Sequence, residues 1–265
     1  MHVALTIAGS DPSGGAGIQA DLKTFHQFGV YGEAVITLLT VQNTYRAGRV
    51  DILSAELVSE QLDAVLEDIP PDAIKTGALG SAEIVSAVAR QMGSFRIPLV
   101  VDPVLVGKQG QALLDESALR ALCEELLPLA TLVTPNVPEA AVLSGIAIHG
   151  PDELPRAAER IRAMGAGAVL LKGGHSAEPG GDRERHATDG LLTAAGWSEF
   201  PAPRIETRHT HGTGCTYSAA ITASLASGLD LPAAVARAKR FIHAAIASAP
   251  GLGRGCGPVN HHAEP

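Results

Sequence analysis

Short apolar segments and segments of helical periodicity alternate along most of this chain, and this alternation constrains the fold more than any other feature. Runs of β-branched and aliphatic residues predict strands at residues 3–8, 34–39, 73–76, 99–102, 132–134 and 168–171. Most of these runs are apolar on both faces, as in a parallel sheet that is covered on both sides. Between them, apolar residues recur every three or four positions and predict helices, with apolar faces at 57–69, 84–92, 119–127 and 154–164.

Strands and helices in turn predict right-handed βαβ units, and so an α/β fold with a mostly parallel sheet and helices on both faces. Two consecutive helices, at residues 216–228 and 232–248, close the chain. Between residues 174 and 208 the pattern gives way to Gly, Pro, Asp and Arg, and residues 185–200 predict a strand hairpin at the sheet edge. No long linker, repeat or charge block divides residues 1–265, so we expect one domain.

The composition argues against several classes of protein. No apolar run reaches the roughly 18 residues of a membrane span, and no basic segment precedes the first apolar residues as in a secretory signal. A net charge of −8 argues against a nucleic-acid surface, which is usually basic. Three cysteines in 265 residues are not a disulfide framework and fit a reducing compartment. We therefore expect a cytoplasmic protein that binds neither nucleic acid nor membranes.

Polar residues and glycines follow most of the predicted strands directly. They occupy residues 9–17, 41–44, 102–110, 134–139 and 172–175. The carboxyl ends of parallel strands meet at one edge of the sheet, where α/β folds bind their ligands. The sequence therefore predicts a site at this edge.

Residues 211–216, His-Gly-Thr-Gly-Cys-Thr, lead directly into a predicted helix. The glycines let backbone N–H groups turn toward one point, and the helix start adds the positive end of its dipole, which together suit phosphate oxygens. The same dipole is expected to lower the pKa of Cys215 and favour its thiolate. The alternative is that the glycines only begin a helix and that Cys215 is a small core residue. Cys123 lies on an apolar helical face and is expected in the core, and Cys256 has no partner that the sequence identifies.

Residues 9–17 do not match two common nucleotide-binding motifs. They depart from G-x-G-x-x-G at its first two glycines, and no Lys-Ser or Lys-Thr follows as in G-x-x-x-x-G-K-[ST]. The absence of both motifs argues against a Rossmann NAD site and against a Walker-type nucleoside triphosphatase. Ser13, Gly14 and Gly15 fit a tight strand-to-helix turn, and Asp21 fits a surface carboxylate of the first helix.

Two other positions at the predicted edge are open to functional interpretation. Glu139, three residues after Asn136 near an expected helix start, fits a helix cap or, with Asn136, a Mg²⁺ ion held through water. The cap is the favoured interpretation. Lys172 ends an apolar strand before two glycines, an unusual place for a lysine that is merely solvated, and a cation there suits a phosphate group.

Together these segments resemble the ribokinase-like superfamily, and within it the bacterial hydroxymethylpyrimidine/phosphomethylpyrimidine kinases of thiamine biosynthesis. The similarity runs nearly from end to end and includes residues 5–24, 134–140, 171–175, 210–216 and 255–259. The first and fourth of these segments are specific to this group, which has Cys215 where the superfamily at large has an aspartate base. The resemblance implies a three-layer α/β sandwich and a homodimer.

The resemblance also implies an activity. Such enzymes use Mg-ATP to phosphorylate 4-amino-5-hydroxymethyl-2-methylpyrimidine and then convert the monophosphate to the diphosphate. The resemblance implies that Cys215 is the base that takes the proton of the hydroxymethyl group and that Lys172 binds the ATP phosphates. The backbone N–H groups that would hold the transferred phosphoryl group are those of Gly212, Thr213 and Gly214. The residues implied for ATP and Mg²⁺ are Asn136, Glu139 and Asp102, with the metal held through water near Asn136 and Glu139.

The pyrimidine pocket implied by the resemblance contains Gly9, Ala16, Gln42 and Val104, with Asp21 also on the substrate side. Gln42 would hydrogen-bond the ring amine or a ring nitrogen, and close relatives can have a glutamate at this place. Family pockets often carry a methionine near Ala78, where this chain has a smaller residue. The glycine-rich residues 107–110 and residues 174–185 are candidates for a lid.

Two phosphorylations would place different demands on Cys215. The first acceptor is an alcohol that must lose a proton, whereas the second is already a phosphate anion. We therefore expect Cys215 to matter more to the first step.

Three other functions are weighed against this one. Pyridoxal kinase activity is an alternative within the superfamily. A thiol hydrolase would use Cys215 as a nucleophile with His209 or His211. A pyrimidine-binding sensor without catalysis is disfavoured, because a sensor needs neither Lys172 nor the Gly-Thr-Gly loop.

Overall fold

The computed structural model describes residues 1–107, 113–173 and 186–265 of the chain. Strands in these ranges form one sheet in the order β3-β2-β1-β4-β5-β6-β7-β8-β9. The strands are β1 (Val3–Ser10), β2 (Tyr31–Gln42), β3 (Ala47–Ile52), β4 (Ala73–Thr76), β5 (Leu99–Val101), β6 (Leu132–Val133), β7 (Val169–Leu171), β8 (His186–Thr193) and β9 (Gly196–Pro203). Neighbours from β2 to β7 run parallel, while β3 at one edge and the β8–β9 hairpin at the other are antiparallel.

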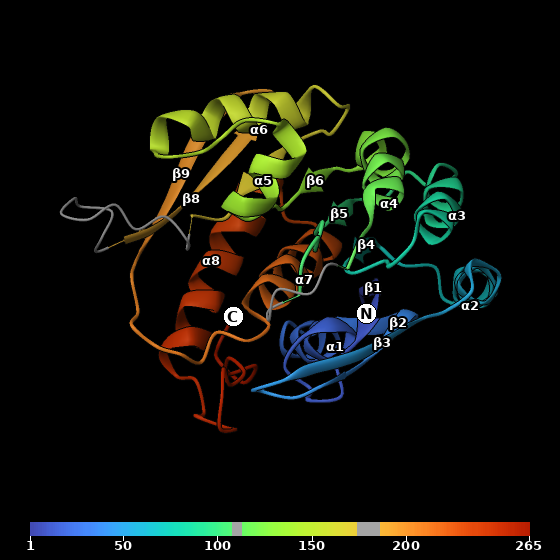
Figure 1. Ribbon diagram of the computed structural model, residues 1–265, viewed down its shortest axis with the longest axis horizontal. Helices are drawn as coiled ribbons and strands as arrows, with labels where there is room; N and C mark the ends of the chain where they lie inside the picture. The colour runs from blue at the N-terminus through green and yellow to red at the C-terminus, as the bar shows by residue number, and fades with distance from the viewer. Residues whose placement is uncertain (108–112, 174–185) are drawn as a thin grey trace.

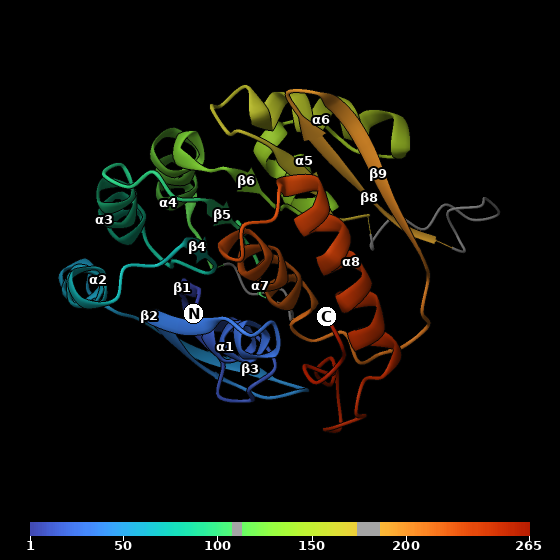
Figure 2. The ribbon, with the colours of Figure 1, turned by 180° about the vertical axis from the view of Figure 1, so that it is seen from behind.

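Helices cover both faces of the sheet and give the molecule three layers (Figures 1 and 2). One face carries α2 (Ala55–Asp68), α3 (Ala82–Met92), α4 (Glu116–Ala121), α5 (Val137–Ser144) and α6 (Leu154–Arg162), with the short turns η1 (Leu122–Leu126), η2 (Leu127–Leu129) and η3 (Pro151–Glu153). The other face carries α1 (Gly17–Gln27), α7 (Thr213–Ala226) and α8 (Leu231–Ala247). The mostly parallel three-layer sandwich with an edge hairpin is therefore confirmed.

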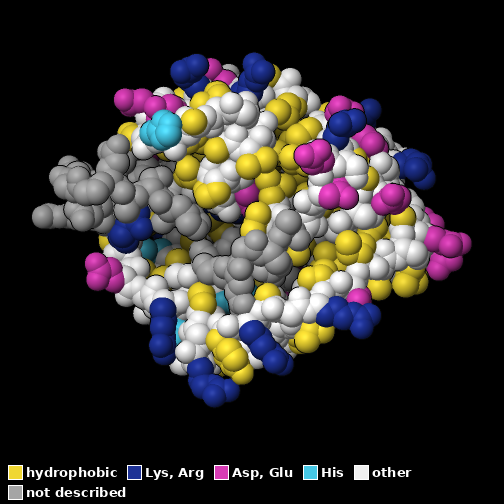
Figure 3. All heavy atoms as spheres, viewed as in Figure 1, with side chains coloured by type: hydrophobic (Ala, Val, Ile, Leu, Met, Phe, Trp, Pro, Cys, Tyr) yellow, Lys and Arg dark blue, Asp and Glu magenta, His cyan; other side chains and the backbone are white. Residues whose placement is uncertain are grey.

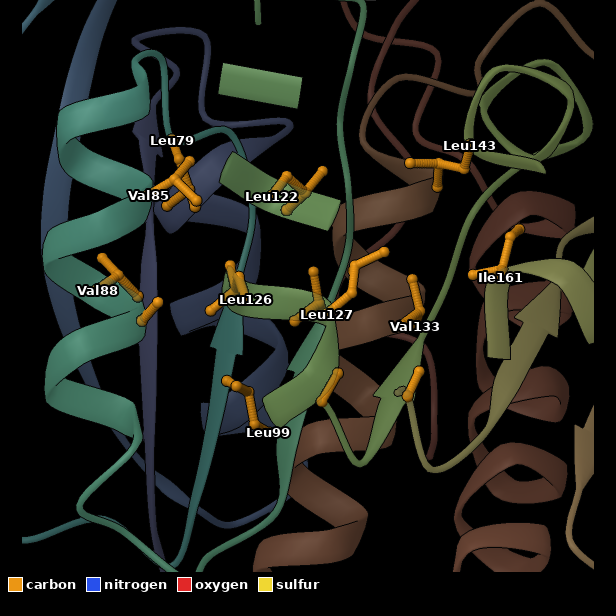
Figure 4. Packing of buried hydrophobic residues seen from close by; sticks show 14 of the residues in the cluster. Leu79, Val85, Val88, Leu99, Leu122, Leu126, Leu127, Val133, Leu143 and Ile161 are labelled. Atoms are coloured by element: carbon orange, nitrogen blue, oxygen red, sulfur yellow. The ribbon is translucent and has the colours of Figure 1, made fainter. Parts of the chain in front are cut away.

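Each strand contributes to two hydrophobic cores because successive side chains point to opposite faces of the sheet. On β1, Leu5 and Ile7 belong to the core under α2–α6, whereas Ala4 belongs to the core under α1, α7 and α8. Figure 4 shows the first core, where Val85 and Val88 of α3 face the leucines of η1 and η2. This double burial explains why the strand sequences are apolar without alternation.

All six predicted strands and the edge hairpin are present, but the sequence did not indicate β3. β3 contains Gly48, Arg49 and Asp51 instead of an apolar run, and much of it is exposed at the edge of the sheet. Charged residues are common on edge strands because they discourage pairing with another chain. β2 also extends beyond its predicted residues 34–39, because its end pairs with β3.

The surface carries both signs of charge. In Figure 3, acidic side chains are most frequent toward the right, over α2 and α3, and lysine and arginine side chains lie along the lower edge. Among the described helices, none has the length and apolar character to cross a membrane. The two lid candidates lie outside the described residues, apart from Gly107.

Candidate active site

A cavity of about 600 Å³ lies at the carboxyl ends of the parallel strands, in front of the start of α7. Its walls include twelve of the thirteen site residues predicted from the sequence: Gly9, Ala16, Gln42, Asp102, Val104, Asn136, Glu139, Lys172, Gly212, Thr213, Gly214 and Cys215. These residues come from seven different elements and loops, so only the fold brings them together. The exception is Asp21.

Helix α7 begins at the cavity wall with a sharply turned backbone. Gly212 is its N-cap residue and has the left-handed conformation, φ 77°, which is unfavourable for residues with a Cβ. The first hydrogen bond of the helix runs from the N–H of Thr216 to the carbonyl oxygen of Gly212, at 2.9 Å. The N–H groups of the residues before Thr216 have no acceptor within the helix. Thr213 differs from the prediction, because its N–H donates to the Thr210 carbonyl at 3.3 Å.

Lys172 lies beside this helix start and pairs with Asp102. Its Nζ is 2.8 Å from Oδ1 of Asp102, and a Cβ on Gly214 would lie 3.4 Å from the same Nζ. Asp102 also accepts hydrogen bonds from Thr134 and Ser218, each at 3.1 Å. Burial opposes ionisation of Asp102, but the charges of Lys172 and Lys75 outweigh it and hold the pKa of Asp102 below its ordinary value. The Lys172 ammonium is thus fixed against the loop where an anion would bind.

Cys215 lies in the first turn of α7, as predicted, but its ionisation differs from the prediction. Burial raises the pKa of the thiol to about 11, and Asp21 and Asp102 add to the rise; Lys75 and the Gly17 N–H oppose it. The expectation that the helix dipole lowers this pKa is therefore wrong. Removal of water from the sulfur outweighs the dipole, because desolvation disfavours the charged form.

Asn136 and Glu139 form a capping box at the start of α5. Oδ1 of Asn136 accepts the N–H of Glu139 and Oε2 of Glu139 accepts the N–H of Asn136, both at 2.9 Å. The favoured interpretation as a helix cap is confirmed. Burial raises the pKa of Glu139, with Lys172 opposing the rise and Asp102 adding to it.

The same residues fit a hydrated magnesium ion better than a directly ligated one. One oxygen of each side chain is already used in the capping box, and the described residues include no group of three or more His, Cys, Asp or Glu that could hold a metal. Mg²⁺ usually keeps several waters and takes only one or two carboxylates together with substrate phosphates. Asp102 and Glu139 line the cavity and can supply those carboxylates.

Gly9, Ala16, Gln42, Ala78 and Val104 also line the cavity. A Cβ on Gly9 would lie 2.5 Å from Cδ1 of Leu38, so a larger residue there would require the buried Leu38 side chain to move. Val104 has φ 30°, which is rare for a β-branched residue. Such backbone strain is found preferentially at functional sites, where the surrounding structure maintains it.

The structure corrects the assignment of Asp21 to the substrate side. Asp21 has no exposed surface and does not line the cavity; it pairs with Lys75 at 2.8 Å. The interpretation as a surface carboxylate of the first helix is also wrong. Asp21 lies on the face of α1 that packs against the sheet, where the cation of Lys75 compensates its charge.

Asp11 and His211 join the two glycine-rich loops, and sequence reasoning did not assign this role to them. His211 Nε2 lies 2.7 Å from Oδ2 of Asp11, which also accepts the N–H of Ala16. Burial of Asp11 favours its neutral form, but hydrogen bonds from His211, Gln42 and Ser13 outweigh it and hold its pKa well below the usual range. The sequence indicated only that both residues lie in glycine-rich segments, Asp11 within residues 9–17 and His211 directly before Gly212.

Lys239 and Asp189 form a second buried pair on the cavity wall that the sequence did not indicate. Nζ of Lys239 is 2.6 Å from Oδ2 of Asp189, and Oδ1 of Asp189 accepts the N–H of Gly173 at 2.8 Å. Lys239 belongs to α8 and Asp189 to β8, and no local pattern relates residues fifty positions apart.

The geometry does not support a thiol hydrolase. In the part of the chain that the structure describes, no histidine hydrogen-bonds the sulfur of Cys215, and His211 is held by Asp11. A nucleophilic cysteine needs an adjacent base or a lowered pKa, and Cys215 has neither.

Replacing Gly212 tests the close approach of the two loops. A Cβ on Gly212 would overlap the Gly15 carbonyl oxygen, whereas Gly228, with φ 86°, has nothing within 4 Å of its Cβ position. Gly228→Ala should lower the free energy of unfolding by about 1–2 kcal/mol, which is the penalty for placing a residue with a Cβ at positive φ. Gly212→Ala should lower the free energy of unfolding in urea by clearly more and weaken ATP binding; equal costs for the two variants would contradict the required close approach.

The chain is similar to known kinases over nearly its whole length. The family model described as phosphomethylpyrimidine kinase matches residues 11–260. The hydroxymethylpyrimidine/phosphomethylpyrimidine kinase of Rhizobium meliloti strain 1021 is 51% identical over 262 residues, which cover 98% of this chain and 96% of that protein. Its counterpart in Bacillus subtilis strain 168 is 44% identical over 264 residues, which cover 99% of this chain and 96% of that protein.

Solved structures give the same result at the level of the fold. An ADP complex of Bacillus subtilis pyridoxal kinase superposes with a TM-score of 0.90 at 38% identity and covers 99% of this chain and 98% of that chain. Phosphomethylpyrimidine kinase from Clostridium difficile 630 gives a TM-score of 0.79 at 41% identity and covers 92% of this chain and 98% of that chain. The chain belongs to the phosphomethylpyrimidine kinase family.

Proposed function

We propose that this chain phosphorylates 4-amino-5-hydroxymethyl-2-methylpyrimidine with ATP and then phosphorylates the monophosphate to the diphosphate, as a kinase of thiamine biosynthesis. The observation that carries the proposal is 51% identity over 98% of the chain to a hydroxymethylpyrimidine/phosphomethylpyrimidine kinase. The cavity supports it, because it combines the glycine loop of α7, a paired lysine and a cysteine in one wall. Phosphoryl transfer depends mainly on positioning and on charge stabilisation, which these groups supply.

The start of α7 and Lys172 would hold the phosphates of ATP. The unpaired N–H groups of the first helical turn and the helix dipole favour an anion. Lys172 adds a positive charge on the same side, and its pairing with Asp102 fixes the ammonium before the nucleotide arrives. Developing negative charge on the transferred group would then meet donors that need no reorganisation.

Magnesium would be held by Asp102 and Glu139, partly through water. Bound to the nucleotide, the metal supplies charge neutralisation of the phosphate oxygens. Lys172 lies against Asp102 and offsets part of its charge, and the same cation favours ionised Glu139, the form that can bind a metal. Asn136 fixes the start of α5 and thereby the position of Glu139.

Cys215 would take the proton of the hydroxymethyl group. With a pKa of about 11, the sulfur is protonated in most molecules at neutral pH. Only the small thiolate fraction can therefore accept the proton, and it becomes a thiol as the alcohol oxygen attacks the phosphoryl group. A phosphate acceptor already carries negative charge at pH 7 and needs no such base. Gln42 would hydrogen-bond the ring, with Gly9, Ala16 and Val104 also lining the pocket.

Pyridoxal kinase activity is the second candidate function. The specific observation is the TM-score of 0.90 to a pyridoxal kinase, against 0.79 to a phosphomethylpyrimidine kinase. Sequence identity favours the pyrimidine substrate, at 51% for a curated relative against 38% for the pyridoxal kinase structure.

The homodimer implied by the resemblance stays a prediction. Leu39, Val41 and Ile52 at the β2–β3 edge are exposed, and this apolar surface is one that a second subunit would cover.

A coupled ATP assay separates the two candidates. The purified chain should convert the aminopyrimidine to mono- and diphosphate, resolved by chromatography, with kcat/KM at least about tenfold above that for pyridoxal, a preference of about 1.4 kcal/mol. Higher kcat/KM for pyridoxal would favour the alternative, and no phosphorylation of either compound would overturn the proposal.

Replacing Cys215 tests its role as a base. Cys215→Ala should lower kcat for the first phosphorylation by about 10²-fold or more, which is typical for loss of a general base. The second phosphorylation should fall by much less, because its acceptor is an anion. The control is Cys123→Ala, remote from the cavity on the opposite side of the sheet, which should leave both rates nearly unchanged. Equal losses in the two steps would contradict the base.

The pH dependence gives an independent check. Because the pKa of Cys215 is about 11, the thiolate fraction rises about tenfold per pH unit below that value. The logarithm of kcat/KM for the hydroxymethyl substrate should therefore rise between pH 7 and pH 9 in steady-state assays. For the monophosphate substrate the profile should be nearly flat over this range. Parallel profiles for the two substrates would show that the thiolate is not the base.

A further inference from the structure

Two fully buried charges lie behind the cavity wall, and the proposed function does not use them. Lys75 of β4 and Asp21 of α1 have no exposed surface, and their Nζ and Oδ2 atoms are 2.8 Å apart. Thr6 of β1 donates its hydroxyl to the same carboxylate oxygen at 2.7 Å. The other oxygen of Asp21, Oδ1, has no hydrogen-bond partner within the described ranges.

This pair is difficult to explain by stability alone. Removing two charges from water costs free energy, and their mutual attraction offsets this cost only when their hydrogen bonds are complete. A buried ion pair therefore often stabilises the folded state no more than apolar side chains of similar size would. Here one carboxylate oxygen is unsatisfied. The neighbouring residues of β4, Ala73 and Ile74, follow the apolar pattern of a covered strand. The pair therefore indicates a role beyond packing.

Two glycines, Gly77 and Gly17, connect the Lys75–Asp21 pair to the surroundings of Cys215. Gly77 follows β4 and lines the cavity together with Cys215, and a Cβ on Gly77 would lie 3.3 Å from Nζ of Lys75. Gly17 begins the helix that carries Asp21, and its N–H hydrogen-bonds the sulfur of Cys215. Both charges thus lie directly behind the part of the wall that contains the sulfur.

The electrostatic effects agree with this placement. Burial raises the pKa of Cys215; Lys75 opposes the rise, and Asp21 and Asp102 add to it. Burial disfavours the charge of Lys75, but Asp21 and Cys215 outweigh it and raise the pKa of the ammonium. Lys172, which lines the cavity together with Cys215, also interacts electrostatically with the thiol.

We propose that the buried Lys75–Asp21 pair controls the charge on the Cys215 sulfur, with Lys75 stabilising the thiolate and Asp21 limiting that stabilisation. Both act through Cys215 and are positioning residues. The consequence for catalysis rests on the proposed function, in which Cys215 is the base. Charge compensation from behind the sulfur leaves the front of the cavity free for the substrate.

Alkylation of Cys215 by iodoacetamide tests the inference without any substrate. The thiolate is the reactive species, so the alkylation rate at fixed pH reports its population. The rate would be followed by intact-protein mass spectrometry in a Cys123→Ser/Cys256→Ser background, where one thiol remains. Circular dichroism would confirm that each variant is folded.

The two single variants should change this rate in opposite directions. Lys75→Met removes the cation and should slow alkylation about tenfold or more, the effect of one pKa unit. Asp21→Asn keeps the cation and removes the opposing charge, so it should speed alkylation. A purely structural role would move both rates the same way, because either variant would loosen the packing around the sulfur. The double variant, which lacks both charges, should lie between the two.

A matched control and a second measurement keep the result decisive. Lys239→Met makes the same replacement in the buried Lys239–Asp189 pair, which has no described interaction with Cys215, and should leave the alkylation rate unchanged. Rates that move together, or that do not move, would overturn the inference. If Lys75→Met does not fold, Asp21→Asn alone decides, and unchanged or slower alkylation overturns it. The first phosphorylation step is then assayed separately: normal turnover with altered alkylation would contradict the base role of Cys215 and leave the inference intact.

Discussion

The site depends on the close backbone approach of two glycine-rich loops, one after β1 and one before α7. Gly212 takes the left-handed conformation and lies so close to the Gly15 carbonyl that no side chain fits between them. Asp11 and His211 hold the same loops together by a hydrogen bond of 2.7 Å. This approach puts the start of α7, with its unpaired N–H groups, at the open end of the sheet, where a phosphate anion can meet it.

Around this helix start the protein arranges charges in pairs. Lys172 lies against Asp102 and Lys75 against Asp21, and each carboxylate compensates a cation that would otherwise be buried alone. Electrostatic interactions are stronger in such surroundings than in water. The pairs therefore fix positive charge near the start of α7 and near Cys215 before any ligand binds. Such preorganisation suits a reaction whose main requirement is to stabilise charge on a transferred group.

The sequence predicted the architecture well because its apolar pattern reflects burial directly. Every predicted parallel strand is present, since strands that are buried on both faces consist mostly of apolar residues. β3 was not predicted, because an exposed edge strand has no such requirement and this one contains Arg49 and Asp51. The edge hairpin was also predicted, but its turn was misplaced: Asp189-Gly190, which suggested a turn, lies within β8, and the chain turns between Thr193 and Gly196.

The sequence by itself determined the α/β architecture, the edge of the sheet where ligands would bind and twelve of the residues that line the cavity. The architecture and the binding edge follow from local patterns and from the rule that parallel strands end together. Gly9, Gln42 and Val104, among other residues of the cavity, were assigned only through the resemblance to the kinase family. Only the tertiary structure decided that Asp21 is buried against Lys75 and that the thiol of Cys215 ionises less readily than an ordinary cysteine. The Lys239–Asp189 pair also formed only on folding. Ionisation depends on how much water the surrounding elements remove and which charges they bring close, and neither is a property of neighbouring residues in the chain.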